Sequence, residues 1–184
     1  MNKMNNTQKS VKIALSGVIS ALSFVIMLLT GLVPFGTYAL PMLAGIIFVA
    51  VVIELGYKYA FTVYIVVAVL SVFFAPDKEA TLCYVVILGY YPIIKGLIEG
   101  KIKSRILQII VKFAVFNVAM VAFYYAGKFI LMIPDESFIV FGIFVPYIFL
   151  IGANIIFVMY DFAIKIIIIK YITSIRNKIF KNNH

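Results

Sequence analysis

Long apolar runs follow one another along the whole chain, and each is bounded by a short polar or Gly/Pro-bearing segment. A helix needs about 20 mostly apolar residues to cross the hydrocarbon core of a bilayer. The pattern therefore predicts an all-α membrane protein, a bundle of six transmembrane helices forming a single integral membrane domain over residues 1–184. The helices are expected at about 11–30, 42–55, 59–74, 80–98, 102–133 and 138–171, followed by a basic cytoplasmic tail at 172–184.

Glycine and proline positions predict where these helices bend or stop. A Gly/Pro-bearing loop is expected at 31–41, a tight turn at Gly56 and a helix end at Ala75-Pro76. Pro92 lies inside the fourth run, and a kink is expected there because proline removes one helical hydrogen bond. The last two runs are longer than one span, so those helices should tilt or protrude.

Composition excludes a soluble domain. The chain has 184 residues, of which 65% are hydrophobic and 12% charged, with a mean hydropathy of +1.13. A soluble domain is about half apolar and about a quarter charged, so lipid must solvate the excess apolar surface. Cys83 is the only cysteine and His184 the only histidine. We therefore expect no disulfide framework, no metal site and no cofactor.

The charges of the loops predict the topology. With six spans, every lysine and arginine except Lys78 and Lys128 falls on the side that holds both termini. The opposite side collects most of the acids, which are Asp77, Glu79, Asp135 and Glu136. The positive-inside rule then places both termini in the cytoplasm.

The first helix carries a stripe of small residues. Ser10, Ala14, Gly17 and Ala21 are spaced by four, three and four residues, which places them on one helical face. Small residues let another helix approach closely in lipid. The stripe favours either a docking face for a partner protein, formed by Ala14, Gly17 and Ala21, or ordinary packing inside the bundle.

Aromatic and polar residues gather toward the predicted non-cytoplasmic side, as expected for a pocket that binds a small ring-bearing ligand. Tyrosines also form aromatic belts at membrane interfaces. Asn117 and Asn154 lie deep in apolar runs, where a hydrogen bond between helices and a ligand contact are both open. The candidate substrate-binding residues are Tyr38, Tyr84, Asn117, Tyr124, Tyr125, Lys128, Tyr147 and Asn154.

The motifs of common enzyme classes do not occur in the sequence. It contains no P-loop glycine pattern, no HExxH and no GxSxG. We therefore expect no catalytic residues and a protein that is not an enzyme. Asp161 lies four residues before Lys165, which favours an ion pair on one helical face. A proton-relay role would require Asp161 to face the bundle interior.

Several segments together resemble the substrate-binding S components of energy-coupling factor (ECF) vitamin transporters. The likeness lies in the basic start, the small-residue first helix ALSGVISALSFVIMLL (14–29), the loop segment TYALPMLAG (37–45) and the segment LGYYPIIKGLIEGKIKSR (88–105). Two long final helices complete the pattern, so the resemblance covers almost the whole chain.

The resemblance implies a multi-pass protein of the bacterial cytoplasmic membrane that captures a vitamin or related micronutrient from outside. ATP hydrolysis would belong to partners, namely a transmembrane coupling subunit with two cytoplasmic ATPases. The coupling subunit would dock on Ala14, Gly17 and Ala21. Because the chain has no tryptophan, tyrosines would stack on the ligand, and Lys128 would suit an anionic group on it.

The alternative is a non-transporting membrane scaffold that resembles the MreD-like cell-shape proteins. These are also small, basic and polytopic. A scaffold would bind no micronutrient, so ligand binding separates the two interpretations.

Overall fold

The computed structural model of this chain describes residues 2–33, 36–132, 139–140 and 143–175, and it describes side chains for 10–33, 36–132 and 148–174. It is built almost wholly from helices, which confirms the all-α class. Among the described residues, five helical segments are long and apolar enough to cross a membrane: Ser10–Gly31, Gly36–Leu55, Tyr57–Phe74, Lys78–Lys101 and Arg105–Ile130. They match the first five predicted spans. The sixth falls on the last long helix and stays a prediction, as does the side of the membrane on which the termini lie.

The N-terminal half contains four long or medium helices. They are α1 (Asn2–Leu28), with the 3-10 turn η1 (Leu29–Gly31), α2 (Gly36–Ile46), α3 (Phe48–Leu55) and α4 (Tyr57–Phe74). The expected loop at 31–41 is wrong beyond Gly36, because α2 already begins there and includes Pro41. The proline ring is fully buried, and its packing overrides the low helix propensity of the residue. The tight turn at Gly56 is confirmed, since its φ of 87° is open to glycine but strained for other residues.

The fourth predicted span is broken rather than smoothly bent. It consists of α5 (Lys78–Cys83), the π-helical turn η2 (Tyr84–Leu88) and α6 (Tyr91–Lys101). Pro92 lies in the first turn of α6, where its missing N–H costs little because those groups have no intrahelical partner. The helical assignment is interrupted at Gly89 and Tyr90, directly before Pro92, whereas the prediction placed Pro92 inside a continuous helix.

The C-terminal half consists of two long helices and the segment between them. These are α7 (Arg105–Ile130), the two-residue antiparallel strands β1 (Ile139–Val140) and β2 (Ile143–Phe144), α8 (Val145–Lys170) and the π-helical turn η4 (Tyr171–Ile175). The helix expected from residue 138 thus begins only at Val145. The strand residues are β-branched or aromatic, and such residues favour extended structure. The tail at 176–184 lies outside the described residues.

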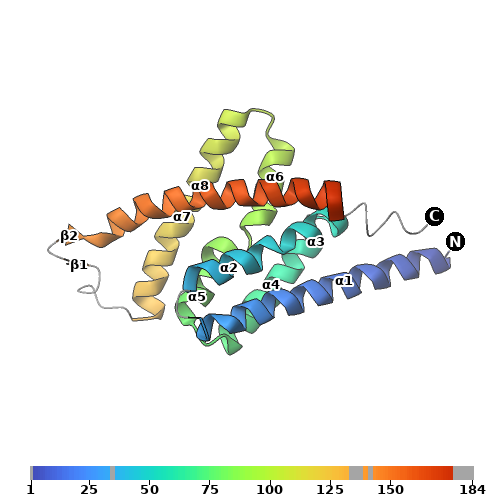
Figure 1. The fold of residues 1–184 in the computed structure, drawn as a ribbon, viewed down its shortest axis with the longest axis horizontal. Helices are drawn as coiled ribbons and strands as arrows, with labels where there is room; N and C mark the ends of the chain where they lie inside the picture. The colour runs from blue at the N-terminus through green and yellow to red at the C-terminus, as the bar shows by residue number, and fades with distance from the viewer. Residues whose placement is uncertain (1, 34–35, 133–138, 141–142, 176–184) are drawn as a thin grey trace.

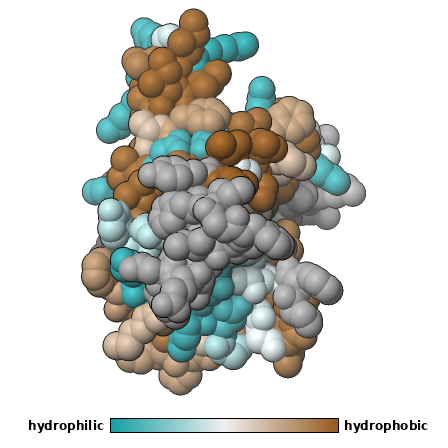
Figure 2. Space-filling model, turned by 90° about the vertical axis from the view of Figure 1, so that its left-hand side faces the viewer, coloured by the Kyte–Doolittle hydropathy of each residue, from teal (hydrophilic) through white to brown (hydrophobic). Residues whose placement is uncertain are grey.

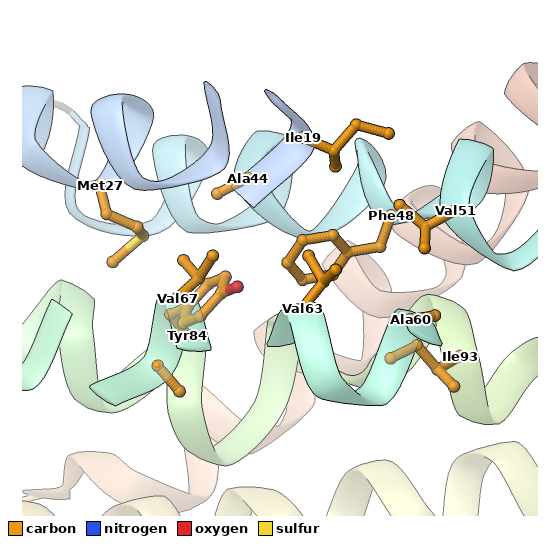
Figure 3. Close-up of a cluster of buried hydrophobic side chains, with 11 residues drawn as sticks. Ile19, Met27, Ala44, Phe48, Val51, Ala60, Val63, Val67, Tyr84 and Ile93 are labelled. Carbon is orange, nitrogen blue, oxygen red and sulfur yellow. The ribbon is translucent and has the colours of Figure 1, made fainter. Parts of the chain in front are cut away.

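Figure 1 shows α1 running alongside α2 and α3, while α7 crosses α8 on the other side of the molecule. The beginning of α1 and the end of α8 lie at the same end of the long axis. One buried cluster joins α1, α2, α3, α4 and η2 around Phe48, Val67 and Tyr84 (Figure 3). A second joins η2, α7 and α8 around Phe116 and Phe157. The two clusters divide the bundle into an α1 side and an α7–α8 side.

Much of the outer surface is apolar, as a lipid solvent requires. Val18, Phe73, Val118 and Phe129 each expose about two thirds or more of their surface, from α1, α4 and α7. On the face seen in Figure 2, apolar side chains reach the surface beside polar ones. Burial of these side chains in the bilayer, rather than in the protein, accounts for the composition.

Candidate functional site

A cavity of about 910 Å³ lies between α2, α5, η2, α7 and α8. Binding sites for small molecules typically have volumes of roughly 300–1,000 Å³, so this cavity has room for a compact ring-bearing ligand. Its lining is mostly apolar, with contributions from Met42, Leu88, Met120 and Ile156. From Ser10 to Leu28, the part of α1 whose side chains the structure describes, no residue lines the cavity. The cavity therefore belongs to the α7–α8 side of the bundle.

Aromatic side chains form the inner floor of the cavity. Phe116 of α7 and Phe157 of α8 are stacked with ring centroids 4.2 Å apart and an angle of 16° between their planes. Tyr160 also lines the cavity, and its hydroxyl donates to the carbonyl of Leu88 at 3.2 Å. The Tyr91 ring packs against Phe157 from α6, with 5.0 Å between centroids. The floor thus ties three helices together beneath the cavity.

The rim of the cavity is polar and joins α2 to α5. Asp77 caps α5 by accepting a hydrogen bond from the Ala80 N–H at 2.9 Å, and it accepts another from the Thr37 hydroxyl at 2.9 Å. Two residues on, Glu79 lines the cavity and accepts a hydrogen bond from the Tyr38 hydroxyl. The adjacent threonine and tyrosine of α2 therefore hold the two carboxylates in place.

Below the aromatic floor, two lysines and two acids form an ionic network between α6, α7 and α8. The Lys95 ammonium lies 2.6 Å from Asp161 Oδ1 and 2.8 Å from Glu99 Oε1. The Lys112 ammonium pairs with the same two acids, and it lies 3.2 Å from Asp161 Oδ1. The Tyr91 hydroxyl donates to Asp161 Oδ1 at 2.5 Å. Tyr91 thus connects the floor, through its ring, to the network, through its hydroxyl.

This network corrects the ion pair expected between Asp161 and Lys165. Asp161 faces the bundle interior and pairs with lysines from two other helices, while Lys165 is exposed. The lysine side chains are nearly fully buried, with 1% and 8% of their surface exposed at Lys95 and Lys112. A buried ammonium needs a carboxylate partner. The network contains two lysines and two acids, so it is formally neutral. Tertiary packing therefore outweighs the weak attraction available on an exposed helical face.

Asn117 and Asn154 bind each other across α7 and α8. Each side-chain amide donates to the carbonyl oxygen of the other, at 3.0 and 3.1 Å. Each also donates to a backbone carbonyl one turn earlier on its own helix, at 2.8 Å. Neither residue lines the cavity. Of the two open interpretations, the structure therefore supports the hydrogen bond between helices.

The structure brings together three of the predicted ligand-contacting residues. Tyr38, Tyr124 and Tyr125 all line the cavity. Tyr84 is fully buried in the other cluster, beside Val67 (Figure 3), and does not reach the cavity. Lys128 is half-buried on the last turn of α7 and is not part of the lining. The side chain of Tyr147 lies outside the described residues.

The sequence analysis missed Glu79, the floor residues and the ionic network. The charge pattern of the loops includes Lys95 and Lys112, although each is flanked by apolar residues on both sides. An ionisable residue inside an apolar run signals a buried partner. That signal was available for both lysines, whereas the aromatic floor resembles any apolar helix segment in sequence.

The small-residue stripe of α1 faces outward. Ala14, Gly17 and Ala21 are all exposed, and a Cβ built on Gly17 would meet no atom within 4 Å. Ordinary packing inside the bundle does not explain the stripe, because no other described helix covers it. This face meets lipid or a partner protein.

Fold and site define this chain as a helical membrane protein with a ligand-sized cavity between α2, α5, η2, α7 and α8. No protein-family model, curated protein or solved structure matches the chain. Function is therefore inferred from the cavity, its rim and floor, and the α1 face.

Proposed function

We propose that the protein is the substrate-binding subunit of an ECF-type importer, and that it captures a vitamin or related micronutrient for a separate ATP-driven module. The observation that carries this proposal is the cavity of about 910 Å³, which is lined by apolar and aromatic side chains and has a polar rim. Such a combination suits a small ligand whose ring is buried and whose polar end is held by a few placed groups.

The layered arrangement of the site supports access from one side. Along α5, η2 and α6 the chain passes from the rim at Glu79, through Leu88, to the network at Lys95 and Glu99. The predicted topology places the rim outside and the network inside the cell. The floor and the network then separate a bound ligand from the cytoplasm, as a capturing subunit requires before release.

The α1 face supports a partner that carries the energy source. Ala14, Gly17 and Ala21 are exposed, and from Ser10 to Leu28 no residue of α1 lines the cavity. A coupling subunit can therefore dock on this face without blocking the ligand. Close helix approach at small residues is a common mode of association in lipid.

Affinity purification of the tagged protein from its host in mild detergent tests the proposal. We expect recovery of one further membrane protein and two ATPases, and we expect Gly17→Leu to abolish this recovery. Ala122→Leu is the matched control, because it also replaces an exposed small residue by leucine, but on α7 and outside the cavity lining. Recovery of cell-wall or cytoskeletal proteins without ATPases would contradict the proposal and favour the MreD-like scaffold.

A further inference from the structure

Charge at the cavity rim limits which ligands the cavity accepts. Among the described residues, Glu79 is the only formally charged residue in the lining. The nearby Lys78 does not neutralise it, because the Lys78 ammonium donates to the carbonyls of Val72 and Ala75, at 3.0 and 3.1 Å, at the end of α4. The cavity is therefore negative at one end and apolar over the rest of its wall.

The neighbouring groups reinforce this negative charge. Asp77 lies two residues from Glu79, on the same rim, with Thr37 as its partner. No basic residue lines the cavity in the described part of the chain, and Lys128 on α7 is not among the lining residues.

We infer that the cavity binds an amphipathic ligand with a ring-bearing apolar body and a positively charged head group, which Glu79 and Tyr38 hold at the rim. This inference rests on the proposed ligand-binding function and names the class of ligand. It reverses the expectation, based on Lys128, of an anionic ligand.

The rim geometry gives Glu79 the means to bind such a head group. The Tyr38 hydroxyl donates to Oε1 of Glu79 and orients the carboxylate, whose Oε2 accepts no hydrogen bond from a described residue. A carboxylate with one oxygen already held can accept a charge-assisted hydrogen bond at the other. Tyr124 and Tyr125, whose rings lie 5.3 Å apart on α7, add aromatic surface to the same cavity, and aromatic faces also attract cations.

Three probes with one ring system and different charges test the inference. They are 2-(aminomethyl)naphthalene (a cation), 2-naphthalenemethanol (neutral) and 2-naphthoic acid (an anion). Binding to the purified full chain is measured by equilibrium dialysis in detergent, with protein-free micelles as the blank. Since a hydrogen bond to a charged group is stronger than one between neutral groups, we expect the cation to bind at least roughly tenfold more tightly than the other two probes.

Two variants assign the preference to one carboxylate. Glu79→Gln keeps a side-chain oxygen for Tyr38 but removes the charge, so we expect it to abolish the preference for the cation. Glu79→Asp is the matched control, because it keeps a carboxylate at the same position, and the preference for the cation should persist there.

Three results would overturn the inference: equal binding of the three probes, a preference that survives in Glu79→Gln, or no binding of any probe above the micelle blank. Failure of the proposed function is distinguishable, because the probes are tested without partners. A protein that prefers the cation but recovers no ATPases would keep this inference and lose the importer assignment.

Discussion

Replacing Lys95 by methionine should destabilise the bundle strongly, because the ionic network depends on balanced charge. The substitution keeps the length of the side chain but removes an ammonium that lies 2.6 Å from Asp161 and 2.8 Å from Glu99. Lys112 is then left with two carboxylates. Lys95 is only 1% exposed, so both acids lose a partner that lies inside the bundle.

The expected magnitude follows from burial. Removing one partner of a buried ion pair costs about 3–5 kcal/mol. The acids are partly exposed, at 26% for Asp161 and 35% for Glu99. Solvent screening therefore reduces the free-energy cost of leaving these two carboxylates without Lys95. We therefore expect Lys95→Met to lower the free energy of unfolding by about 2–4 kcal/mol.

A double-mutant cycle with Asp161→Leu isolates the pair. The first variant leaves one excess negative charge and the second one excess positive charge. The double variant leaves Lys112 paired with Glu99 and is formally neutral again. We expect it to be more stable than the sum of the single effects predicts, with a coupling free energy of about 1–3 kcal/mol.

Unfolding of the purified protein from mixed detergent micelles by added dodecyl sulfate, followed by circular dichroism, measures these energies. The matched control is the same cycle with Lys165→Met, since Lys165 is exposed and makes no ion pair with Asp161 in the structure. That cycle should be additive. Additive effects at Lys95 and Asp161, or equal coupling in both cycles, would refute the network.

Further predictions concern packing and docking. Asn117→Leu and Asn154→Leu should each lower the free energy of unfolding by about 1–2 kcal/mol in the same assay, because the remaining amide loses its partner. The double variant should lower it by less than the sum of the two single effects, and additive losses would argue against the hydrogen-bonded pair. Gly45→Ala should destabilise by about 1–3 kcal/mol, since a Cβ there would lie 2.5 Å from the Leu88 carbonyl oxygen, and wild-type stability would contradict this close approach. Gly17→Leu should not lower the free energy of unfolding, because its Cβ direction is open and leucine has a higher helix propensity than glycine. A lower free energy of unfolding would contradict this expectation. A loss of partners without such a decrease reports docking and not misfolding.

The pattern of apolar runs determined the class of this protein and the positions of most of its spans. The reason is that a helix needs about 20 apolar residues to cross the lipid core, and each such run can be recognised in the sequence without knowledge of the others. The turn at Gly56 was also predictable, since it depends on local backbone geometry. The early start of α2 at Gly36 was not, because buried packing of Pro41 overrides local propensity there.

Only the tertiary structure decided which side chains meet. Asp161 had a partner available one turn away at Lys165, yet it pairs with Lys95 and Lys112 from other helices. The rotation of α8 about its axis determines which lysines Asp161 can reach. That rotation depends on the contacts that all faces of the helix make, and not on residue spacing along one apolar run. For the same reason Glu79 lines the cavity, whereas Tyr84 lies in the buried core. The negative charge of the proposed site therefore follows from the packing of the helices and could not be predicted from the sequence.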